Sequence, residues 1–192
     1  KATVYQDYAS DIEVKLSNTY SFTAYQFDFT LPEGFTMAKG DNGKYLVKKS
    51  NRYSDNAQQV RISELSENTY RVMCVSMQNG VINGTDGIIL TLSVNVAEDV
   101  AVGSYDAVIK NIVLTAADET KVNPENETYT IEVLSLVKGD ANGDDEIDVA
   151  DIVVMVNNVI GNASTSFIKE AADLNNDRVV DIFDIINAIK LV

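Results

Sequence analysis

The sequence predicts two domains, an all-β antiparallel sandwich over residues 1–135 and a small all-α domain over residues 138–192. Three observations lead to this expectation. Segments that alternate between apolar and polar residues fill the first two thirds of the chain, and turn residues separate them. A twelve-residue pattern of acids and amides then occurs twice. Apolar residues with helical spacing follow each copy of it.

About nine strands are expected in the first domain, in a jelly-roll or similar sandwich. Phe27, Phe29 and Leu31 alternate with polar residues, as expected of a strand with one buried face. Gly, Asn, Asp and Pro gather between such segments, for example at 40–43 and 79–80. The expected strands lie at 2–6, 11–17, 22–32, 44–50, 58–65, 69–77, 87–97, 104–115 and 128–134.

The repeated pattern spans residues 140–151 (DANGDDEIDVAD) and 173–184 (DLNNDRVVDIFD), 33 residues apart. Oxygen-bearing side chains fall at positions 1, 3, 5, 9 and 12 of both copies. In calcium loops of this length alternate residues turn their oxygens inward, position 7 gives a backbone carbonyl and position 12 a carboxylate. Softer metals are not expected, because His is absent and there is one Cys. The expected ligands of two calcium ions are Asp140, Asn142, Asp144, Glu146, Asp148 and Asp151 in the first copy, and Asp173, Asn175, Asp177, Val179, Asp181 and Asp184 in the second.

Solvated turns are the alternative interpretation of these segments, because Asp and Asn bond their own backbone and adopt left-handed conformations. A second copy that matches at every ligand position makes this alternative much weaker. Position 6, where calcium loops usually have Gly, is Asp145 in the first copy and Arg178 in the second. Since Arg adopts the left-handed conformation less readily than Asp, we expect the second loop to be strained or to bind calcium more weakly.

The flanking residues distinguish these loops from ordinary EF-hands. Helical spacing follows each loop, in DIVVMVNNVIG at 151–161 and DIFDIINAIKLV at 181–192, so each loop begins a helix. Residues 128–139 alternate like a strand, so the helix that precedes an EF-hand loop is missing. A short middle helix is expected at 166–172. On these features residues 138–192 resemble a dockerin domain, the module that attaches glycan-degrading enzymes and scaffold proteins to cohesin receptors.

The resemblance to dockerins implies a three-helix domain that holds two calcium ions and binds a protein partner through its helix surfaces. In the best-known dockerins, positions 10 and 11 are a hydroxyl pair, and positions 17 and 18 are often basic. These positions are mostly apolar here, which predicts a more hydrophobic interface. Core packing is the alternative, because apolar helix stripes usually face a core; Phe183 is the best candidate for an exposed contact. The candidate partner-binding residues are Val149, Ala150, Val156, Asn157, Ile182, Phe183, Ile189 and Lys190.

The first domain resembles the cohesin-like sandwich domains over about residues 1–134. The resemblance rests on strand order and spacing, in GIILTLSVNVAEDVAVGSYDAVIKNIVLT at 87–115 and FTAYQFDFTLPEGFT at 22–36. Another sandwich of nine strands, including a carbohydrate-binding module, is the alternative, since many functions share this architecture.

Charge, cysteine content and hydropathy narrow the functional classes. The formal net charge of −14 disfavours nucleic acid and anionic membranes, because both are bound through Lys and Arg. Cys74 lies alone in a strand pattern, so we expect it to be buried rather than nucleophilic. No stretch approaches the roughly 18 apolar residues of a membrane span. The chain begins at Lys1 without a visible signal peptide, so we expect a trimmed, secreted or cell-surface bacterial protein, where extracellular calcium suits the loops.

Catalysis is not expected from this sequence. A glycosidase needs two carboxyls in one site, and His, Trp, a nucleophile elbow and a phosphate-binding glycine loop are absent. No pair stands out among the sandwich acids Asp28, Glu64, Glu67, Asp86 and Asp106. Strand packing is favoured over a sugar-binding platform for the early tyrosines Tyr5, Tyr8, Tyr20, Tyr25, Tyr45 and Tyr53.

The sequence therefore predicts a non-catalytic, calcium-dependent docking protein of a secreted or cell-surface glycan-handling assembly. Its partner would be a cohesin-like domain, in another chain or in this one, because only residues 135–138 connect the two domains. In the alternative function the sandwich binds carbohydrate as an adhesin, and the C-terminal domain is an anchor.

Overall fold

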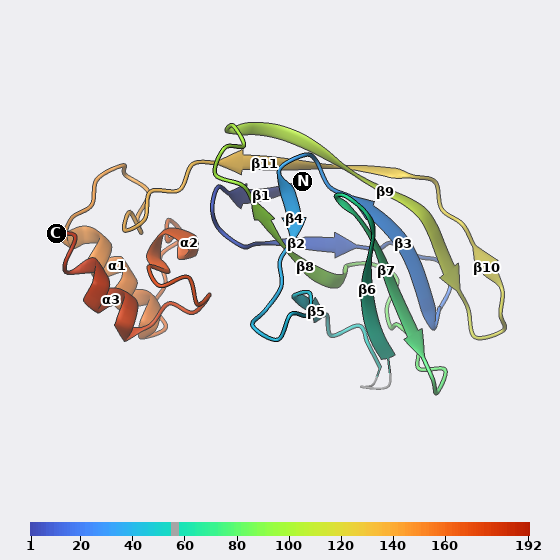
Figure 1. Cartoon of the computed structure of the whole chain (residues 1–192). Helices are drawn as coiled ribbons and strands as arrows, with labels where there is room; N and C mark the ends of the chain where they lie inside the picture. The colour runs from blue at the N-terminus through green and yellow to red at the C-terminus, as the bar shows by residue number, and fades with distance from the viewer. Residues whose placement is uncertain (55–57) are drawn as a thin grey trace. The chain divides into compact units, whose positions relative to one another are not determined.

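The computed structural model describes residues 1–54 and 58–192, and the chain divides into two compact units, Lys1–Leu134 and Ser135–Val192. The described residues of the first unit form eleven strands, and those of the second form three helices (Figure 1). Each unit has a hydrophobic core of its own.

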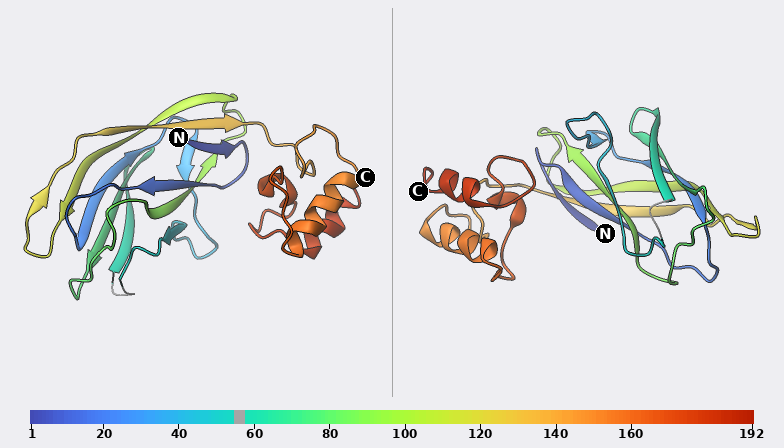
Figure 2. Two further views of the ribbon diagram at one scale, coloured as in Figure 1. Left: turned by 180° about the vertical axis from the view of Figure 1, so that it is seen from behind. Right: turned by 90° about the horizontal axis from the view of Figure 1, so that it is seen from below.

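The larger sheet of the first unit has the strand order β1-β11-β9-β3-β7-β6, and β10 also pairs with β9 (Figures 1 and 2). β1 runs parallel to β11, from Ala2 opposite Ile131 to Tyr5 opposite Leu134, and the other pairs are antiparallel. The strands are β1 (Ala2–Tyr5), β3 (Ala24–Thr30), β6 (Gln58–Ser66), β7 (Thr69–Ser76), β9 (Gly103–Thr115), β10 (Lys121–Val122) and β11 (Glu127–Leu134).

The smaller sheet has the order β2-β8-β4, with β5 also paired to β8. Its strands are β2 (Ser10–Lys15), β4 (Phe35–Met37), β5 (Val47–Lys49) and β8 (Ile88–Val96). Leu90, Leu92 and Val94 of β8 are completely buried, so the alternation in the sequence does mark the core face. All nine expected strands are present, and β4 and β10, with 3 and 2 residues, are additional.

The core lies between the two sheets, and an irregularity in β9 enlarges it. The pairing of β3 with β9 shifts register between Gln26 and Asp28, and Asn111 on β9 has a left-handed backbone with φ 53°. The extra residue places both Ile109 and Ile112 against the core, although strict alternation would put them on opposite faces.

A buried arginine joins the loops at one end of the sandwich. The Arg52 side chain donates from Nε to the carbonyl of Asn83 (2.6 Å), from Nη1 to the carbonyl of Leu16 (2.8 Å) and from Nη2 to Oδ1 of Asn18 (2.6 Å). Burial lowers its pKa. These bonds satisfy a guanidinium that would be costly to bury alone.

The second unit contains α1 (Val149–Val159), α2 (Lys169–Ala172) and α3 (Ile182–Ala188). Its core consists mostly of small or flexible side chains from all three helices and the loop before α1, and α1 packs against α3. The core residues are Ala141, Met155, Ala172, Ile185 and Ala188. Among the described residues, no helix is long and apolar enough to cross a membrane.

Candidate functional site

The two acid-rich loops of the second unit fold in the same way. In the first loop (140–151), Oδ1 of Asp140 accepts the backbone N–H of Asp144 (3.1 Å) and Oδ2 accepts that of Asp145 (3.0 Å). In the second loop (173–184), Oδ1 of Asp173 accepts from Asp177 (3.1 Å) and Oδ2 from Arg178 (2.8 Å). The aspartate at position 1 therefore accepts hydrogen bonds from equivalent loop amides in both copies.

Position 12 of each loop also ties the loop to its own backbone. Oδ1 of Asp151 accepts from the amide of Asn142 (3.1 Å), and Oδ2 accepts from that of Asp148 (2.8 Å). Asp184 repeats these bonds with Asn175 (3.2 Å) and Asp181 (3.0 Å). The carboxylates at positions 1 and 12, Asp140, Asp151, Asp173 and Asp184, are all at most 5% exposed. Four carboxylates are thus enclosed in a small unit, which is energetically costly without a compensating charge.

Positions 3 and 5 form local turns that are the same in both loops. Oδ1 of Asn142 accepts the amide of Asp144 (2.9 Å), and Asn175 does the same with Asp177 (2.9 Å). Oδ1 of Asp144 accepts the amide of Glu146 (3.0 Å), and Oδ1 of Asp177 accepts that of Val179 (2.9 Å). Glu146 and Val179 are exposed and were expected to contribute only backbone carbonyls.

The position 9 acids act as helix N-caps. Asp148 accepts from the amide of Ala150 (2.7 Å) and begins α1, and Asp181 accepts from the amide of Phe183 (2.8 Å) and begins α3. In both helices the position 12 acid completes a capping box with this residue. A role in helix capping is therefore established for two residues that were expected as calcium ligands.

Position 6 has the left-handed backbone that calcium loops require there. Asp145 has φ 68° and Arg178 has φ 72°, as expected from the place usually held by glycine. Among the described residues, no three His, Cys, Asp or Glu side chains form a group that could hold a metal ion. That finding concerns His, Cys, Asp and Glu alone, whereas each expected ligand set also includes an amide oxygen and a backbone carbonyl. Calcium binding by the loops therefore stays a prediction.

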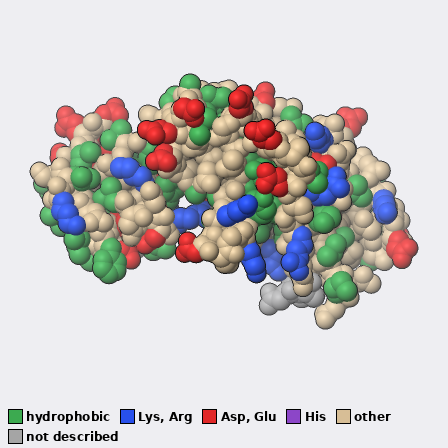
Figure 3. Space-filling view, viewed as in Figure 1, with side chains coloured by type: hydrophobic (Ala, Val, Ile, Leu, Met, Phe, Trp, Pro, Cys, Tyr) green, Lys and Arg blue, Asp and Glu red, His purple; other side chains and the backbone are tan. Residues whose placement is uncertain are grey.

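Two helix surfaces of the second unit leave apolar side chains in solvent (Figure 3). Val149, Val153 and Val156 project from α1, and Ile182, Ile186 and Ile189 occupy the same positions at the other repeat. We call these two sets the apolar ridges. All six side chains are at least 39% exposed, and Phe183 beside the second ridge is 64% exposed.

Core packing is therefore the wrong interpretation for the expected partner-binding residues Val149, Val156, Ile182, Phe183 and Ile189, because other side chains fill the core. Ala150 and Lys190 are also exposed, and Asn157 is half-buried.

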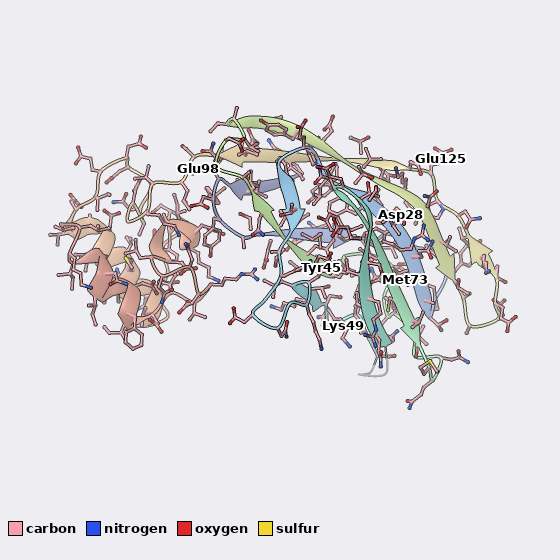
Figure 4. The ribbon with its side chains drawn as sticks, viewed as in Figure 1. Asp28, Tyr45, Lys49, Met73, Glu98 and Glu125 are labelled. Carbon is pink, nitrogen blue, oxygen red and sulfur yellow. The ribbon has the colours of Figure 1, made fainter. Side chains whose placement is uncertain are left out.

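The outer face of the larger sheet is a second extended surface. Asp28 lies at its centre, accepting from Nε (2.7 Å) and Nη2 (2.9 Å) of Arg71 and from Nδ2 of Asn111 (2.7 Å). The hydrogen bonds from Arg71 hold the pKa of Asp28 below its ordinary value. In the next row of the sheet Met73 lies opposite Gln26, and Figure 4 shows Asp28 and Met73 on their adjacent strands. We call this surface the sheet face; the sequence did not indicate it, because its rows depend on strand pairing.

Among the described residues of the sandwich, Asp28, Glu64 and Asp106 each bond a different neighbour. Asp28 has a lowered pKa, whereas a general acid needs a raised one. Glu64 accepts from the hydroxyl of Tyr45 (3.2 Å), and Asp106 accepts from that of Thr130 (3.2 Å). Cys74 is buried, as expected, and burial raises the pKa of its thiol to about 11.

The early tyrosines mostly pack within the sandwich rather than forming a platform. Tyr8 and Tyr25 are buried, and the hydroxyl of Tyr25 bonds that of Tyr53 (2.6 Å). Tyr5, Tyr45 and Tyr53 are half-buried, and Tyr20 alone among these six is exposed. Strand packing is therefore confirmed for Tyr8 and Tyr25.

Solved structures that are similar in fold to the sandwich include several cohesins. The seventh ScaB type I cohesin from Pseudobacteroides cellulosolvens aligns with a TM-score of 0.57 and 11% identity, over 71% of this chain and 90% of that one. A non-cellulosomal cohesin from Archaeoglobus fulgidus aligns with a TM-score of 0.53 and 15% identity, over 70% of this chain and 86% of that one. A chain of the type I cohesin–dockerin complex Coh-OlpC-Doc435 from Clostridium thermocellum aligns with a TM-score of 0.52 and 13% identity, over 70% of this chain and 91% of that one. No protein-family model and no curated protein matches the sequence. The first unit therefore has a cohesin-like fold, and at these identities the likeness concerns the fold alone.

Proposed function

We propose that this chain is a non-catalytic docking protein whose helical unit, loaded with two calcium ions, binds a cohesin-like sandwich through its apolar ridges. The observation that carries the proposal is the repetition of exposed apolar residues at equivalent positions of α1 and α3. A monomeric domain of this size has little reason to expose two such ridges, and contiguous exposed apolar surface marks interaction sites. The resemblance of residues 138–192 to dockerins supports the same assignment.

Calcium would occupy the two loops and fix the ridges. Asp140, Asn142, Asp144 and Asp151 would hold one ion, with the carbonyl of Glu146, and Asp173, Asn175, Asp177 and Asp184 would hold the other, with the carbonyl of Val179. Asp148 and Asp181 cap the helices and would reach calcium through water at most. The donor set fits this cation, since it contains only carboxylate, amide and carbonyl oxygens. The enclosed position 1 and position 12 carboxylates supply the negative charge that a bound cation compensates.

The sandwich of the same chain is a candidate receptor. Its fold is that of cohesins, one of which is described in complex with a dockerin, and its sheet face combines apolar and hydrogen-bonding side chains. Such a composition is typical of protein interfaces. We place the chain in a secreted or cell-surface assembly, where calcium is abundant enough to fill loops of this kind.

Mixing the two units tests the proposal. Residues 1–134 and 135–192 are produced separately, and their association is measured by titration calorimetry with calcium and with a chelator. We expect binding that needs calcium and that falls at least tenfold in Val153→Asp and Ile186→Asp. The matched control is Val137→Asp, an exposed valine of the same unit outside the ridges, which should bind normally. Equal binding with and without calcium would contradict the proposal, and so would binding by both ridge variants that is as tight as that of the wild type. If the units do not associate while residues 1–134 bind a glycan array, the adhesin function is favoured instead.

A further inference from the structure

Asn142 and Gly143, at positions 3 and 4 of the first loop, form a chemically labile pair. The sequence holds four Asn-Gly pairs, and this is the one that lies in the helical unit. The backbone nitrogen of a glycine attacks the side chain of a preceding asparagine readily, because glycine has no Cβ to hinder the approach. This reaction makes asparagine a thermolabile residue.

The packing of the first loop requires the glycine of this pair. Gly143 has φ 78°, and a Cβ at this position would lie 2.9 Å from Cδ1 of Ile168. The equivalent residue of the second loop is Asn176, with φ 59°, whose Oδ1 accepts from Nζ of Lys138 (2.6 Å). The first loop therefore keeps the labile pair for steric reasons, and the second loop has no Asn-Gly pair.

In the folded loop, hydrogen bonds engage each group that the reaction needs. The amide of Gly143 donates to Oδ1 of Asp140 (2.7 Å), whose carboxylate is buried. The side chain of Asn142 is bound at both ends, because Oδ1 accepts the amide of Asp144 (2.9 Å) and Nδ2 donates to Oδ2 of Asp144 (2.8 Å). The attacking nitrogen and the side chain under attack are thus fixed by separate partners. The fold of the loop protects Asn142.

We propose that Asn142 is a modification site, where loss of calcium allows a spontaneous deamidation that closes the first loop to calcium permanently. The inference rests on the proposed function, in which calcium keeps this loop folded. In the unfolded loop the nitrogen of Gly143 bonds to Cγ of Asn142, the side-chain nitrogen leaves as ammonia with the proton of the Gly143 amide, and a succinimide ring forms. Water then adds to either carbonyl of the ring, which gives isoaspartate or aspartate.

Isoaspartate is the product that inactivates the loop. It adds one carbon to the main chain at position 142 and shortens the side chain by one carbon. A calcium loop of twelve residues depends on the spacing of its ligands along the backbone, so the oxygens on the two sides of position 3 no longer converge. Aspartate instead keeps an oxygen at position 3, where calcium loops commonly have it.

Mass spectrometry of aged protein tests the proposal. The full chain is incubated at neutral pH in calcium or in EGTA and digested with trypsin; fragment spectra locate each deamidation, and isoaspartyl methyltransferase detects isoaspartate. We expect Asn142 to deamidate at least tenfold faster in EGTA. Gly143→Ala in EGTA should slow the reaction at Asn142 at least tenfold, because a methyl group hinders the attack even when the loop is unfolded.

Asn42 of the sandwich is the matched internal control. The amide of Gly43 donates to the carbonyl of Gly40 (2.9 Å), and Oδ1 of Asn42 accepts the amide of Lys44 (2.9 Å). This Asn-Gly pair is thus held much as Asn142 and Gly143 are, but in the unit without calcium loops. Its deamidation rate should be the same in both buffers, and an equal acceleration of Asn42 and Asn142 in EGTA would overturn the proposal.

Calorimetric titration with calcium separates this inference from the proposed function. Fresh protein and fresh Asn142→Asp should bind two ions, whereas protein with isoaspartate at 142 should bind one. If fresh protein binds calcium and loses its helices in EGTA, equal deamidation of Asn142 in both buffers would overturn this inference alone. Two ions bound by the isoaspartate form would do the same. If fresh protein binds no calcium, the proposed function fails, and the inference fails with it.

Discussion

Asp28 lies on the sheet face with its carboxylate held by Arg71 and Asn111. It is 2% exposed, so its ionised form depends on these donors rather than on water. The hydrogen bonds of Arg71 lower the pKa of Asp28 in the folded protein, so folding favours the ionised form. The resulting stability is present above the unfolded pKa of about 4 and is lost as the pH falls through the lower folded pKa.

We expect Asp28→Asn to destabilise the sandwich by about 1–3 kcal/mol at pH 7, because one charge-assisted pair is replaced by weaker bonds. The variant should also lack the part of the loss of stability below about pH 4 that the protonation of Asp28 causes in the wild type. Urea unfolding at several pH values measures both effects. Asp106→Asn, on the same face but away from Arg71, should keep the wild-type profile, and a parallel loss in Asp28→Asn and wild type would contradict the role of the pair.

Arg178 shows how one backbone angle could limit calcium binding. A side chain at φ 72° is strained by about 1 kcal/mol relative to glycine. Arg178→Gly should therefore bind calcium in the second loop about fivefold more tightly, since 1.4 kcal/mol corresponds to a tenfold change. Arg178→Ala keeps the strain and separates it from the loss of the arginine side chain. Calorimetric titration of both variants decides, and equal gains in the two would mean that the side chain matters rather than the backbone.

At the scale of elements, alternation predicted the strands but not their irregularities. The pattern over 104–115 marked β9 correctly, yet the left-handed Asn111 changes which residues face the core after it. Ile112 joins the core only because of this bulge. A bulge is set by pairing with β3, which lies far away in sequence, so local pattern could not reveal it.

The helices show a similar limit. Their apolar spacing predicted α1 and α3, but two apolar stripes were present on each and only one could face inward. Met155 and Ile185 fill the core with alanines, and the valines and isoleucines of the apolar ridges remain outside. The spacing of apolar residues predicts that a helix has an apolar face, whereas the elements packed against the helix decide which face is buried.

The helix caps and the expected ligands can be separated experimentally. Asp148→Ala removes the N-cap of α1 and should cost the calcium-loaded helical unit about 1 kcal/mol. Asp140→Ala removes hydrogen bonds to Asp144 and Asp145 together with an expected ligand, and should abolish binding of one of the two ions. Urea unfolding followed by helical circular dichroism in saturating calcium measures the first effect, and calorimetric titration with calcium measures the second. If Asp148→Ala lost as much calcium affinity as Asp140→Ala, position 9 would be a direct ligand.

For the whole molecule, the negative charge is concentrated in one unit, so we expect calcium to act on the folding of that unit. Residues 135–192 hold 4 basic and 11 acidic side chains and so carry −7 of the net −14. Four of these acids are enclosed at positions 1 and 12, and the helical core is made of few and mostly small side chains. The sandwich instead has a large core of its own. Self-repulsion should therefore weigh more on the helical unit than on the sandwich.

A chelator should consequently unfold the helical unit and leave the sandwich intact. Bound calcium neutralises two charges per ion, and its binding free energy adds to the stability of the only state that forms the loops. We expect two thermal transitions in calcium, one for each unit. Removal of calcium should abolish the transition of the helical unit. The buried strand amides of the sandwich, such as those of β8, should keep their protection from hydrogen exchange. A sandwich-only fragment of residues 1–134 serves as control and should melt at the same temperature in both buffers. A single transition that shifts as one with calcium would instead mean that the two units fold together.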